Sequence, residues 1–168
     1  MYPVKGFTLL ELIIVLIISM LLITIGIPGF QTLIQNNRLT SVAGTIQHHL
    51  LFARNQSFNL ITDVTVCPLD DNTNKCTNNW ISGIDVFTDT GDKYTKDGND
   101  ILLKTGEPFN AGDQLVFPRK NVTYSPDGQI TGSSENFRYC TGEQRIGVHV
   151  AYSGRAKVID GSEFTDCN

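Results

Sequence analysis

Near its N-terminus the chain carries a long apolar segment. Residues 7–27 are apolar on every side of a helix, which would span roughly 30 Å, the thickness of a bilayer core. No charged residue lies between Glu11 and Arg38. The pattern predicts a helix over 7–29 suited to lipid or to a fully buried bundle. We expect a kink or a melted turn at Pro28, because proline removes a helical hydrogen bond.

An amphipathic helix is predicted directly afterwards, over residues 30–59. Its apolar residues recur at spacings of three and four, while the opposite face is polar. We expect this apolar stripe to pack on a globular domain and the helix to end near Ser57–Asn59. The stripe consists of Phe30, Leu33, Ile34, Leu39, Val42, Ala43, Ile46, Leu50 and Ala53.

From Leu60 onward the hydrophobic period falls to about two, which is typical of strands. The stretch 89–100 is expected to be a hairpin loop, and Ser125–Gly128 and Ser153–Gly154 are expected to be turns. The fold class is therefore α+β, with one long N-terminal helix packed on an antiparallel β-sheet domain over 60–168. The predicted strands are 63–67, 80–88, 101–105, 114–117, 122–125, 136–141, 145–152 and 155–159.

The composition mainly excludes certain classes of protein. The 168 residues are 40% hydrophobic and 18% charged, so the chain is too apolar for a disordered protein and long enough for one domain with an accessory segment. The net charge of −4 argues against a general nucleic-acid coating protein, although not against a local basic patch. The sequence lacks the common hydrolase, metalloprotease and P-loop motifs. We therefore expect neither enzymatic activity nor a cofactor.

The first residues allow three interpretations. A secretory signal peptide could have Lys5 as its basic n-region, but no A-x-A-like cleavage site follows and Glu11 lies at the head of the apolar run. A plain membrane anchor fits the length alone. The third interpretation accounts for the segment Lys5-Gly6-Phe7-Thr8-Leu9-Leu10-Glu11, which resembles the prepilin signature of type IV pilins and type II secretion pseudopilins.

This resemblance implies a leader over residues 1–6, which a prepilin peptidase removes by cutting after Gly6. Phe7 would then become the N-methylated first residue. Glu11 would pair with the N-terminal amine of a neighbouring subunit, which would offset the cost of a carboxylate in hydrocarbon. The alternative is a Glu11 side chain that reaches the lipid surface. In this family the helix bends or unwinds near Pro28 on assembly; alternatively, Pro28 simply marks the membrane exit.

Two further motifs narrow the resemblance to the GspH/FimT branch of this family. They are the W-x-x-G-x-x-V-F pattern in Trp80–Asp89, and Tyr124–Gly128 followed by a strand that ends in Cys140. The resemblance implies a FimT/FimU-like minor type IV pilin of the pilus tip or priming complex, with other minor and major pilins as partners. The alternative is a GspH-like minor pseudopilin, which would assemble with other pseudopilins for protein export.

Either identity implies the same route through the cell. The precursor would cross the inner membrane once, with its globular domain in the periplasm. It would then enter a pilus or a periplasmic pseudopilus.

Four cysteines allow three disulfide connectivities in an oxidising compartment. We favour Cys67–Cys76 and Cys140–Cys167, because each closes a local loop and the second would fix the C-terminus. A zinc site is the alternative, but the sequence contains no C-x-x-C pair and no zinc-ligand spacing.

Histidines and aspartates supply no metal-binding pattern either. His48 and His49 lie about 100° apart on the predicted helix and are expected to be surface or groove-lining imidazoles, and His149 is expected to be structural. The loop over 89–100 suggests calcium, but the EF-hand order is not met. We therefore expect a solvated acidic loop, with no metal, of Asp89, Asp92, Asp97 and Asp100.

The last third of the chain suggests double-stranded DNA as a candidate partner. Gly154-Arg155-Ala156-Lys157 resembles the G-R-x-R element of DNA-binding FimT-type pilins, with lysine in place of the final arginine. Arg155 and Lys157 share one strand face, and Arg145 of the neighbouring strand could join them. Ordinary solvent-exposed charge is the alternative. The candidate contacts are Arg119, Lys120, Arg138, Arg145, Arg155 and Lys157.

Overall fold

The structure is a computed structural model that describes residues 6–165 and 167, without the side chains of residues 25–29 and 31. The chain divides into two compact units, Met1–Asn37 and Arg38–Asn168. Of the leader proposed over residues 1–6, only Gly6 lies within the described residues.

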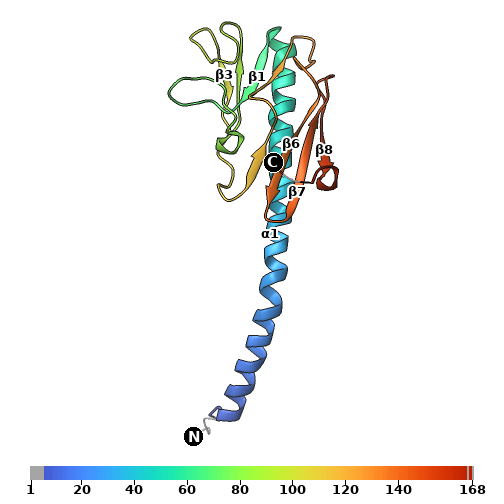
Figure 1. Ribbon diagram of the computed structural model, residues 1–168. Helices are drawn as coiled ribbons and strands as arrows, with labels where there is room; N and C mark the ends of the chain where they lie inside the picture. The colour runs from blue at the N-terminus through green and yellow to red at the C-terminus, as the bar shows by residue number, and fades with distance from the viewer. Residues whose placement is uncertain (1–5, 166, 168) are drawn as a thin grey trace. The chain divides into compact units, whose positions relative to one another are not determined.

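A single helix, α1 (Leu9–Leu60), belongs to both units and ends one residue beyond the boundary expected from the sequence. Helix assignment is continuous through position 28. The side chain of Pro28 lies outside the described residues, so the kink expected there stays a prediction. In the second unit, the later half of α1 lies beside the strands (Figure 1).

The second unit contains two four-stranded antiparallel sheets. The first sheet has the order β3-β2-β1-β5, and the second has the order β4-β6-β7-β8. The strands of the first sheet are β1 (Val64–Cys67), β2 (Asp85–Thr88), β3 (Leu102–Lys104) and β5 (Val122–Tyr124). Those of the second are β4 (Gln114–Val116), β6 (Glu135–Thr141), β7 (Gln144–Val150) and β8 (Ala156–Asp160). These sheets and α1 confirm the α+β pilin architecture expected from the sequence.

One of the eight predicted strands is only partly a strand. The stretch expected over 80–88 begins with a short 3-10 helix, η1 (Trp80–Ser82), and becomes extended only at β2. Gly83 lies between the two elements, with a positive φ of 126° that favours glycine. The reason lies in Trp80, which is buried and donates a hydrogen bond from its indole Nε1 to the Arg119 carbonyl at 2.9 Å.

An aromatic cluster in the core joins η1 to the second sheet. The Trp80 ring stands edge-on to Phe137 of β6, with centroids 4.8 Å apart. Phe117, which follows β4, stacks on Phe137 at 4.1 Å. Edge-on and offset aromatic pairs of this kind contribute about 0.5–1.5 kcal/mol beyond the area they bury. The cluster therefore fixes η1, at the entrance to the first sheet, against the second sheet.

The apolar stripe of α1 packs on this core only from Leu39 onward. Leu39, Val42, Ala43, Ile46, Leu50 and Ala53 are buried. The sequence expectation was wrong for Phe30, Leu33 and Ile34, which are exposed. Those three residues belong to the first unit, whose described residues consist of the start of α1 and its short approach, so no sheet of that unit covers them.

Candidate functional site

The proposed processing segment leads directly into the first turn of α1. Thr8 caps the helix, because its side-chain oxygen accepts a hydrogen bond from the Glu11 N–H at 3.2 Å. The Thr8-x-x-Glu11 spacing is that of a capping box, a signal that the sequence interpretation overlooked. Glu11 also lies where the positive end of the helix dipole favours a negative charge. The start of α1 is thus set by the same residues that carry the prepilin resemblance.

The first unit presents an apolar surface with no cover of its own. Every described side chain from Phe7 to Thr24 is exposed, including Leu9 at 77% and Met20 at 71%. Exposed apolar patches of this extent mark contact sites for proteins or lipids. Among the described residues, the structure contains no helix whose length and hydropathy together suffice for a membrane crossing.

A second candidate site lies on the face of the β4-β6-β7-β8 sheet that points away from α1. Phe137 of β6 pairs with Val148 of β7, and both are buried in the core. Side chains alternate along a strand, so Arg138 projects from the opposite side of the sheet. We call this side the outer face. Lys157 of β8 also lies on the outer face. It pairs with His149 of β7, and His149 lies on the side of β7 opposite to its buried neighbour Val148.

The register places the outer-face residues in short rows across the strands. One row contains Asn136, His149 and Lys157, with His149 Nδ1 and Asn136 Oδ1 hydrogen-bonded at 2.6 Å. The next row contains Arg138, Gly147 and Ile159. Arg138 and Lys157 therefore lie on one face two strands apart.

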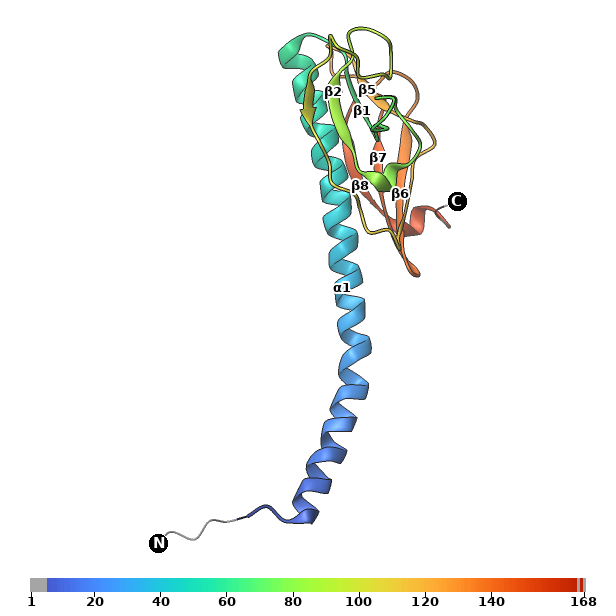
Figure 2. The ribbon, with the colours of Figure 1, turned by 90° about the vertical axis from the view of Figure 1, so that its left-hand side faces the viewer.

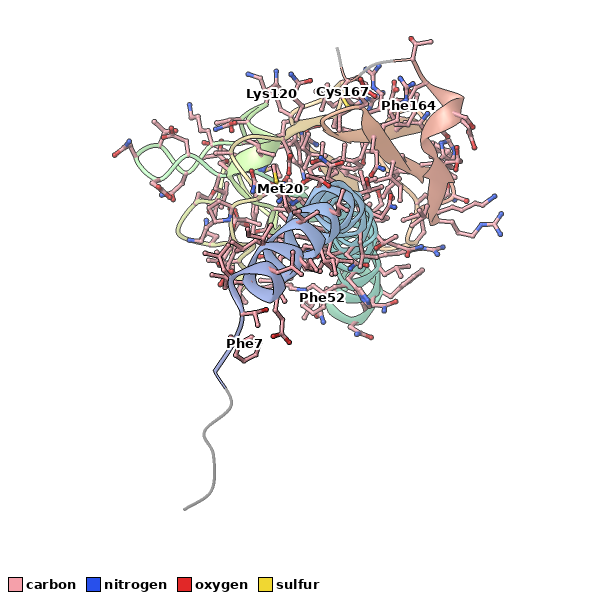
Figure 3. The ribbon with its side chains drawn as sticks, turned by 90° about the horizontal axis from the view of Figure 1, so that it is seen from below. Phe7, Met20, Phe52, Lys120, Phe164 and Cys167 are labelled. Atoms are coloured by element: carbon pink, nitrogen blue, oxygen red, sulfur yellow. A yellow bond between two sulfur atoms is a disulfide. The ribbon has the colours of Figure 1, made fainter. Side chains whose placement is uncertain are left out.

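Arg145 reaches the same face but is held by the C-terminal segment. It pairs with Cys140 of β6, and its guanidinium donates a hydrogen bond to the backbone carbonyl of Thr165. The disulfide between Cys140 and Cys167 fixes that segment to the sheet, with Cα atoms 6.2 Å apart. Figures 2 and 3 show the segment, including Phe164 and Cys167, on the side of the sheet away from α1.

The remaining cationic candidates lie elsewhere. Arg155 is exposed in the turn that leads into β8. Arg119 and Lys120 belong to the loop between β4 and β5. The Arg119 guanidinium donates hydrogen bonds to the Ser133 hydroxyl at 2.5 Å and to the Thr131 carbonyl at 3.5 Å, so it holds a loop in place. The strands thus place three of the six predicted cations, Arg138, Arg145 and Lys157, on one face of the sheet.

The acidic loop differs from the sequence expectation. Asp89 and Asp100 are buried rather than solvated. Asp100 accepts hydrogen bonds from the backbone of Thr90 and Asp97, at 2.8 and 3.1 Å. Asp89 accepts one from the Thr65 hydroxyl at 2.6 Å. These carboxylates are buried because loop N–H groups and hydroxyls replace water as their hydrogen-bond donors.

Two other buried polar groups lie where α1 meets the strands. Asp113 forms an ion pair with Arg38 at 3.1 Å and accepts a hydrogen bond from the Tyr139 hydroxyl at 2.5 Å. Burial acts to raise the pKa of Asp113, but the hydrogen bonds from Tyr139, Thr141 and Arg38 outweigh it and lower the pKa. His49 is buried, contrary to the surface or groove position expected from the sequence, and burial lowers its pKa.

The cysteines are joined as loop closure favours. Cys67 is bonded to Cys76, with Cα atoms 5.5 Å apart, and Cys140 is bonded to Cys167. Within the described part of the chain, no group of three or more His, Cys, Asp or Glu side chains is placed to hold a metal ion.

Comparison with known families decides the classification. Residues 42–155 match the family described as type II transport protein GspH, and residues 1–27 match the prokaryotic N-terminal methylation motif. The chain belongs to the GspH family. This confirms the resemblance identified from the sequence. Proteins of this pilin and pseudopilin family are structural components, generally without enzymatic activity, and the methylation motif implies a precursor anchored in a membrane before assembly.

Two solved structures share the fold at low sequence identity. Two crystal structures of the type IV minor pilin FimU from Pseudomonas aeruginosa are 16% and 14% identical, with TM-scores of 0.62 and 0.60. They cover 79% and 77% of this chain and 97% and 100% of their own chains. The minor pseudopilin EpsH of the type 2 secretion system of Vibrio cholerae is 17% identical, with a TM-score of 0.47, covering 73% of this chain and 97% of its own. No curated protein matches the sequence.

Proposed function

We propose that this protein is a minor type IV pilin, a non-enzymatic component of the pilus tip or priming complex. One observation carries the proposal. The methylation motif over residues 1–27 includes the start of α1, and the described apolar side chains from Phe7 to Ile23 are exposed. A prepilin peptidase removes residues 1–6. Residues 7–29 then hold the protein in the inner membrane as a single pass, with residues 60–168 in the periplasm. On assembly with other minor and major pilins, the apolar helix enters the filament core, and the chain bends near Pro28.

Glu11 is the proposed assembly residue. Cleavage after Gly6 creates an ammonium group four residues before Glu11, while the capped first turn fixes the position of that residue. An amine from a neighbouring subunit would neutralise the carboxylate and offset the cost of taking it into an apolar environment. Only one axial position of the incoming subunit satisfies this pairing, so the interaction would set the register.

Mass spectrometry of assembled filaments tests both steps. We expect a mature chain that begins with N-methylated Phe7. The Glu11→Gln variant should be cleaved normally but should be missing from filaments, whereas Glu163→Gln, at an exposed position in the globular unit, should assemble. An intact Met1 in assembled protein would refute the processing step. Normal incorporation of Glu11→Gln would refute the assigned role of Glu11.

A GspH-like role in type II secretion is the alternative. The two disulfides and the Gly154–Lys157 element favour the pilus branch. Deletion of the protein discriminates between the two. Loss of twitching or DNA uptake supports the pilus role, whereas loss of exoprotein secretion with normal twitching supports the pseudopilin role.

DNA capture is a second candidate function, supported by the outer-face cations. Arg138 and Lys157 project from one side of the sheet, and Arg155 is exposed beside it. Full-length protein in a non-ionic detergent would be titrated with a short DNA duplex over a range of salt concentrations. For binding through phosphates, the Arg155→Ala, Lys157→Ala variant should reduce the salt slope by about 0.9 for each lost contact. The matched Lys75→Ala, Lys96→Ala variant, altered in a different loop region, should retain the slope.

A further inference from the structure

The described C-terminal residues, 161–165 and Cys167, form a strap across the end of the outer face. It begins with η2 (Gly161–Glu163), which the Asp160 side chain caps by accepting a hydrogen bond from the Ser162 N–H at 2.8 Å. It ends at Cys167, which is bonded to Cys140 in β6. Between these two points, Arg145 donates its hydrogen bond to the Thr165 carbonyl. The strap is therefore attached at both ends and held in the middle by a cation of the sheet.

The disulfide that closes the strap borders a cavity, and Cys140 is its more exposed end. A cavity of about 530 Å³ is lined by both Cys140 and Cys167, together with Gln114, Glu143, Arg145 and Thr165. Cys167 is buried at 4% exposure, but Cys140 is half-buried, whereas Cys67 and Cys76 are both buried, at 0% and 7% exposure. Thiol–disulfide exchange needs access of a thiolate to a sulfur atom. A small dithiol should therefore reach Cys140–Cys167 first.

Opening the strap would change the charge that the outer face offers. Arg145 pairs with Cys140, and Arg138 lies two residues earlier on β6, so the two arginines are diagonal neighbours on adjacent strands, about 7–8 Å apart. Arg145 is engaged by the strap at Thr165, and position 161 is packed so closely on it that any Cβ there would overlap its side chain. Arg145 is already exposed, so opening the strap would not uncover it but would remove the Thr165 carbonyl that its guanidinium binds and free that group to turn toward Arg138.

We propose that the Cys140–Cys167 disulfide is a latch, which a dithiol opens to free the C-terminal strap and release Arg145 for a phosphate-bearing ligand. In the chemical step, one thiolate of the dithiol attacks a sulfur of the disulfide and forms a mixed disulfide. The second thiol then closes the dithiol into its own disulfide and releases the second cysteine. The cystine gains two electrons and two protons, and the dithiol loses the same number. The ligand half of the proposal rests on the DNA capture proposed above.

Selective reduction tests the latch without any ligand. Full-length protein in non-ionic detergent would be treated with limiting dithiothreitol, alkylated and analysed by peptide mass spectrometry. We expect Cys140 and Cys167 to be alkylated well before Cys67 and Cys76. Equal rates, or the reverse order, would overturn the latch.

The released charge is tested by DNA titration of the Cys140→Ser, Cys167→Ser variant. Its salt slope should be steeper than that of wild type by about 0.9, the value for one added phosphate contact, and Arg145→Ala in the same background should remove the increase. A Cys67→Ser, Cys76→Ser variant, with the strap still closed, should keep the wild-type slope. Circular dichroism establishes that the variants fold, and selectively reduced wild type replaces any variant that does not.

The outcomes separate the two proposals. If wild type binds DNA and the opened protein has the same slope, the latch proposal fails and DNA capture stands. If neither form binds DNA at low salt, DNA capture fails and the release of Arg145 for a phosphate ligand fails with it. An increased slope that depends on Arg145 supports both.

Discussion

Alanine at position 154 should destabilise the globular unit, because both the backbone and the surroundings of Gly154 require glycine. Gly154 has a φ of 78° in the turn between β7 and β8. A left-handed conformation costs an L-residue about 1–2 kcal/mol. A Cβ at this position would also overlap the carbonyl oxygen of Gly128, the same oxygen that accepts a hydrogen bond from Arg54 Nε at 3.0 Å. Losing that hydrogen bond adds about 1 kcal/mol, so Gly154→Ala should reduce the free energy of unfolding by roughly 2–3 kcal/mol.

The matched substitution at Gly44 should act in the opposite direction. Gly44 lies within α1, and a Cβ added there would meet no atom within 4 Å. Glycine in a helix interior is about 0.8–1 kcal/mol less favourable than alanine. Gly44→Ala should therefore increase the free energy of unfolding by up to about 1 kcal/mol.

Thermal unfolding of the full-length protein in non-ionic detergent, followed by circular dichroism, measures both changes. For a domain of this size, 1 kcal/mol corresponds to about 2–4 °C in Tm. Gly154→Ala should lower the Tm by roughly 4–12 °C, and Gly44→Ala should raise it by up to about 4 °C. An unchanged Tm for Gly154→Ala, or shifts of the same sign for both variants, would show that the geometry argued for the β7–β8 turn is wrong.

Two further predictions concern buried titratable groups. Tyr139→Phe should cost about 1–3 kcal/mol, because buried Asp113 loses a hydroxyl donor at 2.5 Å. Because the pKa of Asp113 is lowered from its ordinary value of 3.8, ionised Asp113 stabilises the folded state above that pH, and this stability is lost as the pH falls. In urea unfolding across pH, the variant should therefore show a smaller decrease in the free energy of unfolding at acid pH. Burial lowers the pKa of His49 from 6.5, so as the pH falls the unfolded chain takes up a proton before the folded one does. The free energy of unfolding should therefore decrease as the pH falls below 6.5. His49→Gln should flatten the decrease in Tm below pH 6.5, whereas the same change at exposed His48 should leave that decrease in place.

The long strand β6 of the second sheet could be predicted because one side of it is buried. Phe137 and Tyr139 alternate with Arg138 in β6, and such alternation is visible in sequence without any knowledge of the neighbouring strands. The same rule failed at Trp80, where the alternating pattern continues into a 3-10 helix. Period alone carries no information about which apolar side chain must turn aside to reach an aromatic cluster.

The acidic loop shows a different limit of sequence reasoning. Residue type indicates that Asp89 and Asp100 prefer water, but their burial depends on where the loop backbone places its N–H groups. Asp100 accepts from the backbone of Thr90 and Asp97, ten and three residues away in the chain. Side-chain-to-backbone bonds over such distances form only after the loop has folded, so composition alone gave the wrong environment.

The outer face required the strand register, which sequence could not supply. Arg155 and Lys157 were linked by their spacing on one strand, but Arg138 joins Lys157 only through the pairings of β6 with β7 and of β7 with β8. A shift of one residue in either pairing would exchange the core and outer residues of a strand. The hold of the strap on Arg145 depends on a contact with Thr165, twenty residues further along the chain. Spacing could therefore identify the cations but not which of them is engaged.

The apolar stripe of α1 connects the fold to the proposed function. Phe30, Leu33 and Ile34 keep the helical spacing that buries Leu39 and Val42, yet they are 63%, 54% and 43% exposed. A stripe that continues past the end of its own core lowers the solubility of an isolated chain, because large exposed apolar side chains favour association. In the proposed filament, neighbouring subunits would cover these positions, as they would cover residues 7–24. Leu39 is thus a boundary within the stripe. From Leu39 onward the apolar residues pack on the protein's own core, whereas the earlier ones would be covered only by neighbouring subunits of the proposed filament.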